Sequence, residues 1–376
     1  MASNSIKIKD IFSDNWSDFL KLNLPIRPVV LDNVNKIIHC GDPKMGHALY
    51  FCDHCGKMKH VPFTCKSRFC NSCGSKYISD RAFSISSKLI HCKHRHLVFT
   101  IPEELRAYFR KDRSLLNLLF DSSASTINRW FSTLNKSEQF TPGFISVIHT
   151  FGRDLKWNPH VHMLLTEGAS GNKTVWRKIS HIPYHVLRRS WQTALLTALY
   201  KKIPSKTFYA LKNSLYERYP DGFYVRAKPN LDQKSHDAIK YIIRYTGRPA
   251  MASSRILDYD GDFVTFFYDQ HEDNQRVTER LHVFDFFKRL IIHIPDHQFK
   301  MIRYYGLYKK KHKNSNKLFH ILSEAKRKFI KRHSHWRARL LLSFGVDSLS
   351  CTCGNTMKLL EIFIPSKNPY LATGPP

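Results

Sequence analysis

The stretch Pro159-His160-Val161-His162-Met163-Leu164-Leu165 decides how this chain is interpreted. The apolar run after His162 predicts a buried β-strand. Side chains alternate between the two faces of a strand, so His160 and His162 point to the same side and Val161 points into a core. Two imidazoles on one face favour a divalent-metal site, because neutral imidazole is a common metal ligand. The competing interpretation is a half-exposed strand face in a chain that carries 21 histidines.

A second run of β-branched and aromatic residues, 143–151, precedes this strand, and the polar residues 152–158 lie between the two runs. Two such runs around a short polar connection predict a β-hairpin. Folding the hairpin about residues 154–155 places His149 opposite His160 and His162. Three imidazoles then converge on one face of a sheet. A hairpin of another register would remove His149 from the set.

The length and charge of the chain indicate a protein of two or three domains with a polyanionic partner. The chain has 376 residues, of which 42% are hydrophobic, which is enough material for a large core. Lys and Arg number 60 against 30 acidic residues, a formal net charge of +30. Such a surplus favours nucleic acid as the partner, with an anionic membrane surface as the main alternative. We find no long apolar span or signal peptide, and therefore expect a soluble, cytoplasmic protein with no membrane partner.

The cysteines predict a zinc site. Six of the nine cysteines lie within residues 40–73, and C-x-x-C spacing without a signal peptide favours metal over disulfides. Cys52-Asp-His-Cys55 and Cys70-Asn-Ser-Cys73 are two knuckles, each followed by glycine, and together they predict a tetrahedral, structural Zn²⁺ site. Cys65 and Cys40 are left over, and they could ligate a second ion or replace one of the four. The alternative for Cys65 is a small buried residue. Cys351-Thr-Cys353 resembles half a knuckle and cannot complete a site alone.

A pair of tyrosines stands out further along the chain. Tyr241 and Tyr245 are four residues apart in a stretch with a helix cap at Ser235 and a stop at Gly247, so both phenols lie on one face of a predicted helix. Periodicity alone favours ordinary amphipathic packing of these rings. From 309 to 339 the chain is densely basic and mostly helical in pattern, which indicates a surface that follows a nucleic-acid backbone, or a solvated face.

These features together favour phosphodiester chemistry. The chain lacks a Walker-type glycine loop and a cluster of carboxylates, so NTP hydrolysis and a two-metal nuclease are both disfavoured. A metal held by histidines can polarise a phosphate, and a tyrosine beside that phosphate can attack it to form a covalent phosphotyrosine. Two tyrosines on one helix face could hold two strand ends in turn.

Three motifs resemble the rolling-circle insertion-sequence transposases that have an HUH nuclease core. They are His149-Thr-Phe-Gly-Arg-Asp-Leu-x-Trp-x-Pro-His-Val-His162, Tyr241-x-x-x-Tyr245-Thr-Gly-Arg and Ile302-Arg-Tyr-Tyr-Gly-Leu307. The cysteine knuckles at 52–73 resemble the zinc-binding domain that those enzymes carry in front. The resemblance covers roughly residues 15–310. It implies that Tyr241 and Tyr245 are nucleophiles, and that His149, His160 and His162 hold Mg²⁺ or Mn²⁺.

The expected fold is α+β, with an antiparallel HUH-type sheet flanked by helices. We divide the chain into a zinc-binding N-terminal domain at 1–92, an HUH tyrosine nuclease domain at 93–306 and a basic helical C-terminal region at 307–376. The expected function is a transposase that nicks single-stranded DNA at element ends and transfers the strand to target DNA, with a host helicase as a candidate partner. The alternatives are a plasmid-type replication initiator or relaxase, and a non-catalytic zinc-dependent DNA-binding protein.

Overall fold

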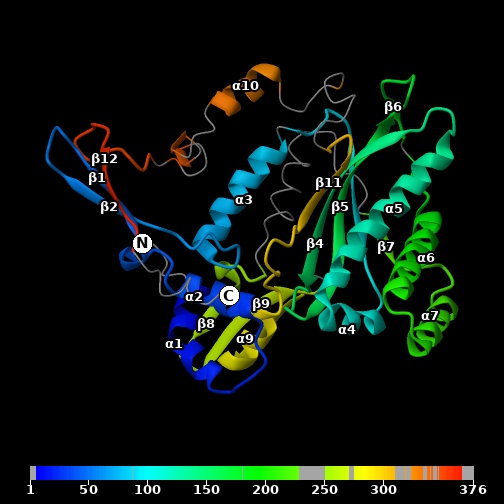
Figure 1. The fold of residues 1–376 in the computed structure, drawn as a ribbon, viewed down its shortest axis with the longest axis horizontal. Coiled ribbons are helices and arrows are strands. Elements are labelled where there is room, and N and C mark those ends of the chain that lie inside the picture. The colour runs from blue at the N-terminus through cyan, green and yellow to red at the C-terminus, as the bar shows by residue number, and fades with distance from the viewer. Residues whose placement is uncertain are drawn as a thin grey trace.

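The structure is a computed structural model that describes residues 6–365, with the exception of 87, 180, 228–249, 271–274, 310–317, 319–322, 333–336, 339, 342–344 and 346. Within this part the chain forms three antiparallel sheets and the helices that pack on them (Figure 1). The predicted α+β class, with antiparallel sheets flanked by helices, is confirmed.

The largest sheet has the strand order β11-β4-β5-β3-β7, and a short strand β6 also pairs with β5. Long β4 and β5 form its centre, and every pairing in it is antiparallel. Its strands are β3 (His94–Phe99), β4 (Thr141–Phe151), β5 (Trp157–Ser170), β6 (Arg177–Lys178), β7 (Val225–Ala227) and β11 (Ile302–Gly306).

One face of this sheet is covered by helices that bury the main hydrophobic core. Phe144, Val161 and Met163 point toward this side and pack against apolar side chains of α5 and α6. Helix α4 begins with two glutamates in its first turn and ends with Arg110 and Lys111, charges that suit the helix dipole. The elements on this face are α4 (Glu103–Lys111), η2 (Arg113–Leu115), α5 (Leu116–Leu134), α6 (Tyr184–Lys202) and α7 (Lys206–Arg218).

The opposite face of the sheet carries the histidines. Helix α3 (Asn71–Ser86) lies on this side (Figure 1), and Ile85 at its end shares a small core with Ile145 and Leu164 of the sheet. Beyond the sheet, Leu307 and Tyr308 close the same core. One face of the sheet is therefore covered by α5 and α6, and the other carries both the histidines and the small core under the end of α3.

A second core combines the start of the predicted first domain with the end of the predicted second domain. Helices α1 and α2 pack with α9 on a three-stranded sheet, and Phe12, Trp16 and Phe19 of α1 surround Phe287 of α9. The elements of this core are α1 (Ile8–Leu20), α2 (Pro28–Ile38), η3 (Ser253–Arg255), β8 (Ile256–Tyr259), β9 (Phe263–Asp269), β10 (Arg276–His282) and α9 (Val283–Ile291). Residues 8–38 thus fold together with residues 250–294.

The third sheet pairs residues 47–62 with residues 358–363, in the strand order β12-β1-β2 (Figure 1). Its strands are β1 (His47–Phe51), β2 (Met58–Pro62) and β12 (Lys358–Phe363), preceded in the chain by η1 (Pro43–Met45) and α10 (Glu324–Arg332). A strand from the region predicted as C-terminal therefore completes a sheet of the N-terminal region. The predicted boundaries at 92/93 and 306/307 stay predictions.

Candidate metal centre

The hairpin of β4 and β5 is present in the register that the sequence predicts. His149 lies directly opposite His160, and Val147 lies opposite His162. The turn is closed by the backbone N–H of Gly152, which donates to the carbonyl oxygen of Lys156 at 3.0 Å. All three histidines consequently occupy one face of the sheet.

The apex of this turn is anchored in the second core. Leu155 adopts a positive φ of 62°, which costs a residue with a β-carbon about 1 kcal/mol or more, and its side chain is fully buried among the residues of that core. The Nε2 of buried His293 donates to the carbonyl oxygen of Leu155 at 2.9 Å. Burial and this hydrogen bond hold the turn, and therefore the register that aligns the histidines.

His149, His160 and His162 form a compact group, the histidine centre. One ligand nitrogen from each ring lies within 4.8 Å of the others, and the Nε2 atoms of His160 and His162 are 3.0 Å apart. His149 and His162 are almost fully buried, whereas His160 is half-buried. Three convergent nitrogens with one partly open side are a donor set that suits a catalytic divalent metal.

The Nδ1 atoms of two of these rings are engaged elsewhere. His160 Nδ1 donates to the carbonyl oxygen of Asn158 at 2.7 Å, so its Nε2 keeps the lone pair. His162 Nδ1 lies 3.0 Å from Nε2 of His96, a buried residue of the neighbouring strand β3. Both Nε2 atoms consequently face the centre. Hydrogen bonds of this kind set the tautomer and the ring orientation of metal-binding histidines.

A small cavity beside His149 is also lined by two residues of the cysteine-rich region. Arg68 and Phe69 line it from one side, and His149, Phe151 and His293 line it from the other. The guanidinium of Arg68 lies 5.1 Å from the centroid of the Tyr77 ring, and burial lowers the pKa of Arg68. A half-buried cation and one of the candidate ligands thus line the same cavity.

The structure corrects the predicted grouping of the cysteines. Instead of one site formed by the two N-terminal knuckles, it contains two groups of four. The Cys40 cluster consists of Cys40, Cys65, Cys70 and Cys73, and the Cys52 cluster consists of Cys52, Cys55, Cys351 and Cys353. The reason is topological. The β1–β2 hairpin carries the first knuckle away from the second, and the pairing of β12 with β1 brings the C-terminal cysteines to the first knuckle.

The spacing of the thiols fits zinc in both clusters. Neighbouring Sγ atoms are 3.6 to 3.7 Å apart in the Cys40 cluster and 3.5 to 3.6 Å apart in the Cys52 cluster. A tetrahedron with Zn–S bonds of about 2.3 Å has edges of about 3.8 Å. A disulfide needs sulfurs about 2.05 Å apart, and all of these cysteines are free. In the Cys52 cluster a hydrogen bond from the backbone of Asn355 lowers the pKa of the Cys353 thiol to about 5, which favours the thiolate that zinc binds.

Two protein-family models match this chain, one over the histidine hairpin and one over the Cys40 cluster. Residues 143–316, which contain the histidine hairpin, match a family model described as a putative transposase. Residues 11–101, which contain the Cys40 cluster, match a model described as a transposase zinc-binding domain. The chain belongs to the insertion-sequence transposases.

Two curated relatives agree with this assignment. The chain is 29% identical over 316 residues to the transposase for insertion sequence element IS801 of Pseudomonas savastanoi pv. phaseolicola, a match that covers 80% of this chain and 75% of the relative. It is 26% identical over 329 residues to the putative transposase y4qJ of Sinorhizobium fredii, with 81% of each chain covered. No solved structure matches the chain. The N-terminal cysteines of the transposase are accordingly those of a structural zinc-binding domain.

The predicted nucleophiles, Tyr241 and Tyr245, lie outside the residues that the structure describes. Of the predicted site residues that it does describe, it brings together the three histidines, and it separates Cys52 and Cys55 from Cys65, Cys70 and Cys73.

Sequence reasoning missed several neighbours of these groups. The sequence leaves open whether Cys40 ligates a second ion or replaces one of the four knuckle cysteines, and it does not indicate that Cys351 and Cys353 complete a site with the first knuckle. The sequence indicates Arg68 only as one of the basic residues around the cysteine knuckles that suit contact with phosphates, not as a neighbour of His149. His96 carries no signal, because it contacts the site through tertiary packing. His96 points to the same face of the sheet as His162, but this follows only from the pairing of β3 with β5, which the sequence does not give.

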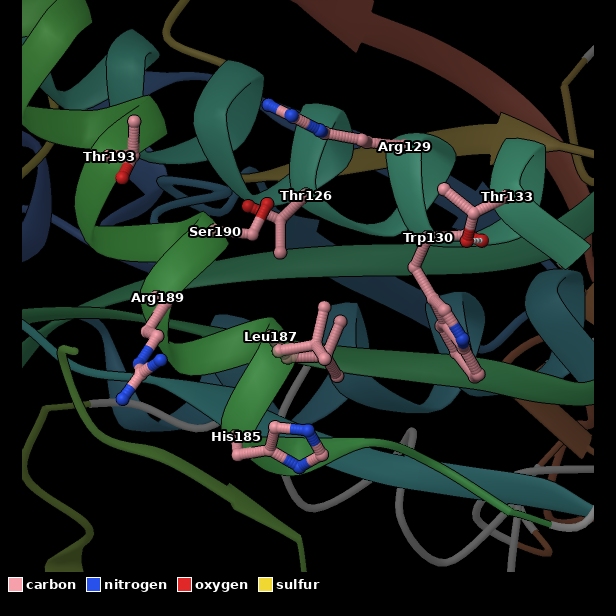
Figure 2. A pocket seen from close by; sticks show the side chains of 10 residues that line it. Thr126, Arg129, Trp130, Thr133, His185, Leu187, Arg189, Ser190 and Thr193 are labelled. Atoms are coloured by element: carbon pink, nitrogen blue, oxygen red, sulfur yellow. Dashed lines mark hydrogen bonds between the residues drawn. The ribbon is translucent and has the colours of Figure 1, made fainter. Parts of the chain in front are cut away.

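A hollow of about 370 Å³ lies elsewhere on the transposase, between α5 and α6 (Figure 2). Arg129 and Arg189 are exposed at its edges, and the hydroxyls of Thr126 and Ser190 point into it. These helices cover the face of the sheet opposite the histidines, so the hollow is not part of the metal centre.

Among the described residues, no helix has the length and apolar character needed to cross a membrane.

Proposed function

We propose that this transposase nicks single-stranded DNA at the ends of its element through a 5′-phosphotyrosine intermediate and transfers the strand to target DNA, as in rolling-circle transposition. The observation that carries the proposal is the convergence of His149, His160 and His162 on one face of a sheet, with ligand nitrogens within 4.8 Å of one another. The net charge of +30 supports a DNA substrate. A host helicase that exposes the single strand remains part of the proposal.

The three histidines would hold a catalytic Mg²⁺ or Mn²⁺. When bound, the ion polarises the scissile phosphate and orients it. The residues fit this role, since the Nε2 atoms of His160 and His162 face one point and their Nδ1 atoms are bonded on the far side. The clustered thiolates of the Cys40 cluster would bind zinc in preference to Mg²⁺.

His96 acts in this scheme as a positioning residue. Its Nε2 accepts a hydrogen bond from Nδ1 of His162 when the Nε2 of His162 is a ligand, at the observed separation of 3.0 Å. Arg68 contributes a half-buried positive charge to the cavity that His149 also lines, which suits the neutralisation of a phosphate. The zinc-binding domain would thus supply a residue to the active site.

Tyr241 and Tyr245 are the proposed nucleophiles, on the basis of their spacing in the sequence. The phenol oxygen forms a bond to phosphorus, the bond from phosphorus to the 3′ oxygen breaks, and that oxygen leaves as a 3′ hydroxyl with a proton. The energy of the broken phosphodiester is kept in the phosphotyrosine, so rejoining needs no ATP. A free phenol is a poor nucleophile at neutral pH, which is why a polarised phosphate is required.

The test is the formation of a covalent protein–DNA adduct. Purified transposase would be incubated with labelled single-stranded oligonucleotides from the element ends, with Mg²⁺ or Mn²⁺, and the products separated under denaturing conditions. We expect an adduct with the wild type and none with the Tyr241→Phe, Tyr245→Phe double variant. An adduct in the double variant would remove both tyrosines from the mechanism.

The choice of substrate separates the proposal from its nearest competitor. A transposase should cleave strands that carry element ends and join them to unrelated target strands. Cleavage of a plasmid origin, without cleavage of element ends, would assign the same chemistry to a replication initiator or relaxase.

A further inference from the structure

The Cys52 cluster takes only half of its ligands from the matched zinc-binding domain, residues 11–101. Cys52 and Cys55 follow β1, whereas Cys351 and Cys353 precede β12 and lie beyond both matched segments. Cys52 Sγ lies 3.6 Å from Cys353 Sγ, and Cys55 Sγ lies 3.5 Å from Cys351 Sγ. We propose that this Cys52 cluster is a second, independent zinc site that fastens the C-terminal segment to the N-terminal hairpin.

In both halves of the cluster a glycine with a positive φ closes the turn that carries the cysteines, over four residues in the first half and three in the second. The N–H of Gly56 donates to the carbonyl oxygen of Cys52 at 2.9 Å, and the N–H of Gly354 donates to that of Cys351 at 3.0 Å. Both glycines have a positive φ, 71° and 88°, which a residue with a β-carbon rarely adopts. Each turn places its two thiols on one side. The C-x-C half therefore matches the C-x-x-C half in spite of its missing residue.

The third sheet has too little core to hold itself together. Its buried apolar cluster consists of Cys52, Cys351 and Met357, with Tyr50 partly buried against it. Strand β12 is exposed along its whole length. The ion pair between Lys358 and Asp53 is exposed and contributes little. Small modules of this kind usually depend on a bound metal for stability. Four thiolates form a zinc site that is closed to further ligands.

Zinc at this position would fix the C-terminal end of the basic segment, whose other end follows β11. The segment from 309 to 339 follows β11 of the central sheet and leads to the Cys52 cluster. Lys59 donates to the backbone of Ser348 at 2.8 Å, and Arg337 pairs with Asp347, so further polar contacts lie on the cluster side. Without the ion we expect the chain beyond β11 to lose this second anchor.

The test is the zinc content of the full chain, measured in a background that carries His160→Ala and His162→Ala so that the histidine centre does not contribute. We expect about two zinc ions per chain in this background, and about one after Cys351→Ser and Cys353→Ser are added. Cys55→Ser, from the other half of the cluster, should cause the same loss. The matched control is Cys92→Ser, because Cys92 is a free cysteine that belongs to neither cluster, and it should keep both ions.

Retention of both ions without Cys351 and Cys353, or a single ion in the background protein, would overturn the proposal. If the variants do not fold, alkylation of the zinc-loaded protein with mass-spectrometric readout decides the matter. We expect Cys52, Cys55, Cys351 and Cys353 to be protected together and to become reactive together as a chelator is added. Free alkylation of Cys351 and Cys353 while Cys52 and Cys55 stay protected would contradict a shared site.

Discussion

The histidine centre and the Cys40 cluster are both compact groups of candidate metal ligands, but they collect their ligands differently. The three histidines come from a single hairpin on the largest sheet. The four cysteines come from the chain after α2, the chain after β2 and the first turn of α3, and two of them are buried in the second core. Three imidazoles leave coordination positions open, whereas four thiolates leave none. The two groups therefore suit different roles, the cysteines a closed structural zinc site and the histidines the open metal site that the proposed chemistry needs.

Removing two ligands of the Cys40 cluster should have the largest effect. Cys70→Ser together with Cys73→Ser should abolish zinc binding at this cluster and unfold the region around α1, α2 and α3, because structural zinc contributes on the order of 10 kcal/mol. DNA cleavage should be lost as a consequence, since Arg68 and Phe69 would leave the cavity beside His149. Thermal unfolding by circular dichroism, with Cys92→Ser as the control, checks this. An unchanged melting temperature would show that the cluster is not structural.

Removing a ligand of the histidine centre should affect only the chemistry. His160→Ala should lower single-strand cleavage on the order of a thousandfold, because the metal supplies several kcal/mol of transition-state stabilisation. The melting temperature should stay unchanged, since His160 is half-buried and outside both cysteine clusters. Cleavage rates measured with saturating Mn²⁺ test this. A large loss of stability would mean that the histidines are structural and that the contrast drawn above fails.

The buried His293 gives the turn of the hairpin a dependence on pH. Burial lowers its pKa from 6.5 to about 4. Between these values the folded state binds fewer protons than the unfolded state, so the contribution is complete above pH 6.5 and is lost as the pH falls toward 4. The shift corresponds to about 3 kcal/mol.

Urea unfolding between pH 7 and pH 4 measures this effect, and His293→Gln is the matched variant because glutamine can still donate to the Leu155 carbonyl but does not titrate. The wild type should lose more stability over this range than the variant. Parallel curves for the two proteins would show that His293 is not the group responsible.

The smallest effect is expected at the edge of the histidine centre. His96→Ala should weaken Mn²⁺ binding about 10- to 100-fold, because the partner that orients His162 is lost. His96→Gln, which keeps an acceptor, should recover part of the affinity. Titration followed by electron paramagnetic resonance measures binding without reference to cleavage. Equal affinity in all three proteins would leave His96 as a packing residue.

The histidine centre was predictable because its information is local. A hairpin of alternating strands fixes which side chains share a face, and the register that pairs His149 with His160 follows from a short turn. The same applies to the C-x-x-C knuckles as metal-binding units. The sequence also indicated the α+β class and the antiparallel sheet, through the strand and helix patterns of residues 94–170.

The grouping of the cysteines was not predictable from spacing. Two knuckles within 21 residues of each other look like one site, but Cys52 has its partner Cys353 at a separation of 301 residues. Only the pairing of β12 with β1 brings these residues together. The sharing of a core by α1 and α9 is non-local in the same way, since Phe12 stacks on Phe287 across most of the chain. Sequence patterns identify the units here, and tertiary packing assigns the partners.

The most direct test of the proposed chemistry is to identify the residue that carries the DNA. After reaction with single-stranded element ends, trypsin would separate the two candidates, because Lys240 and Arg244 place Tyr241 and Tyr245 on different peptides. Mass spectrometry should find a nucleotide-linked peptide at residues 241–244 or at the peptide that begins at 245, and only when the histidine centre is intact. An adduct on any other residue, or one that persists in the His160→Ala variant at the wild-type rate, would contradict the account.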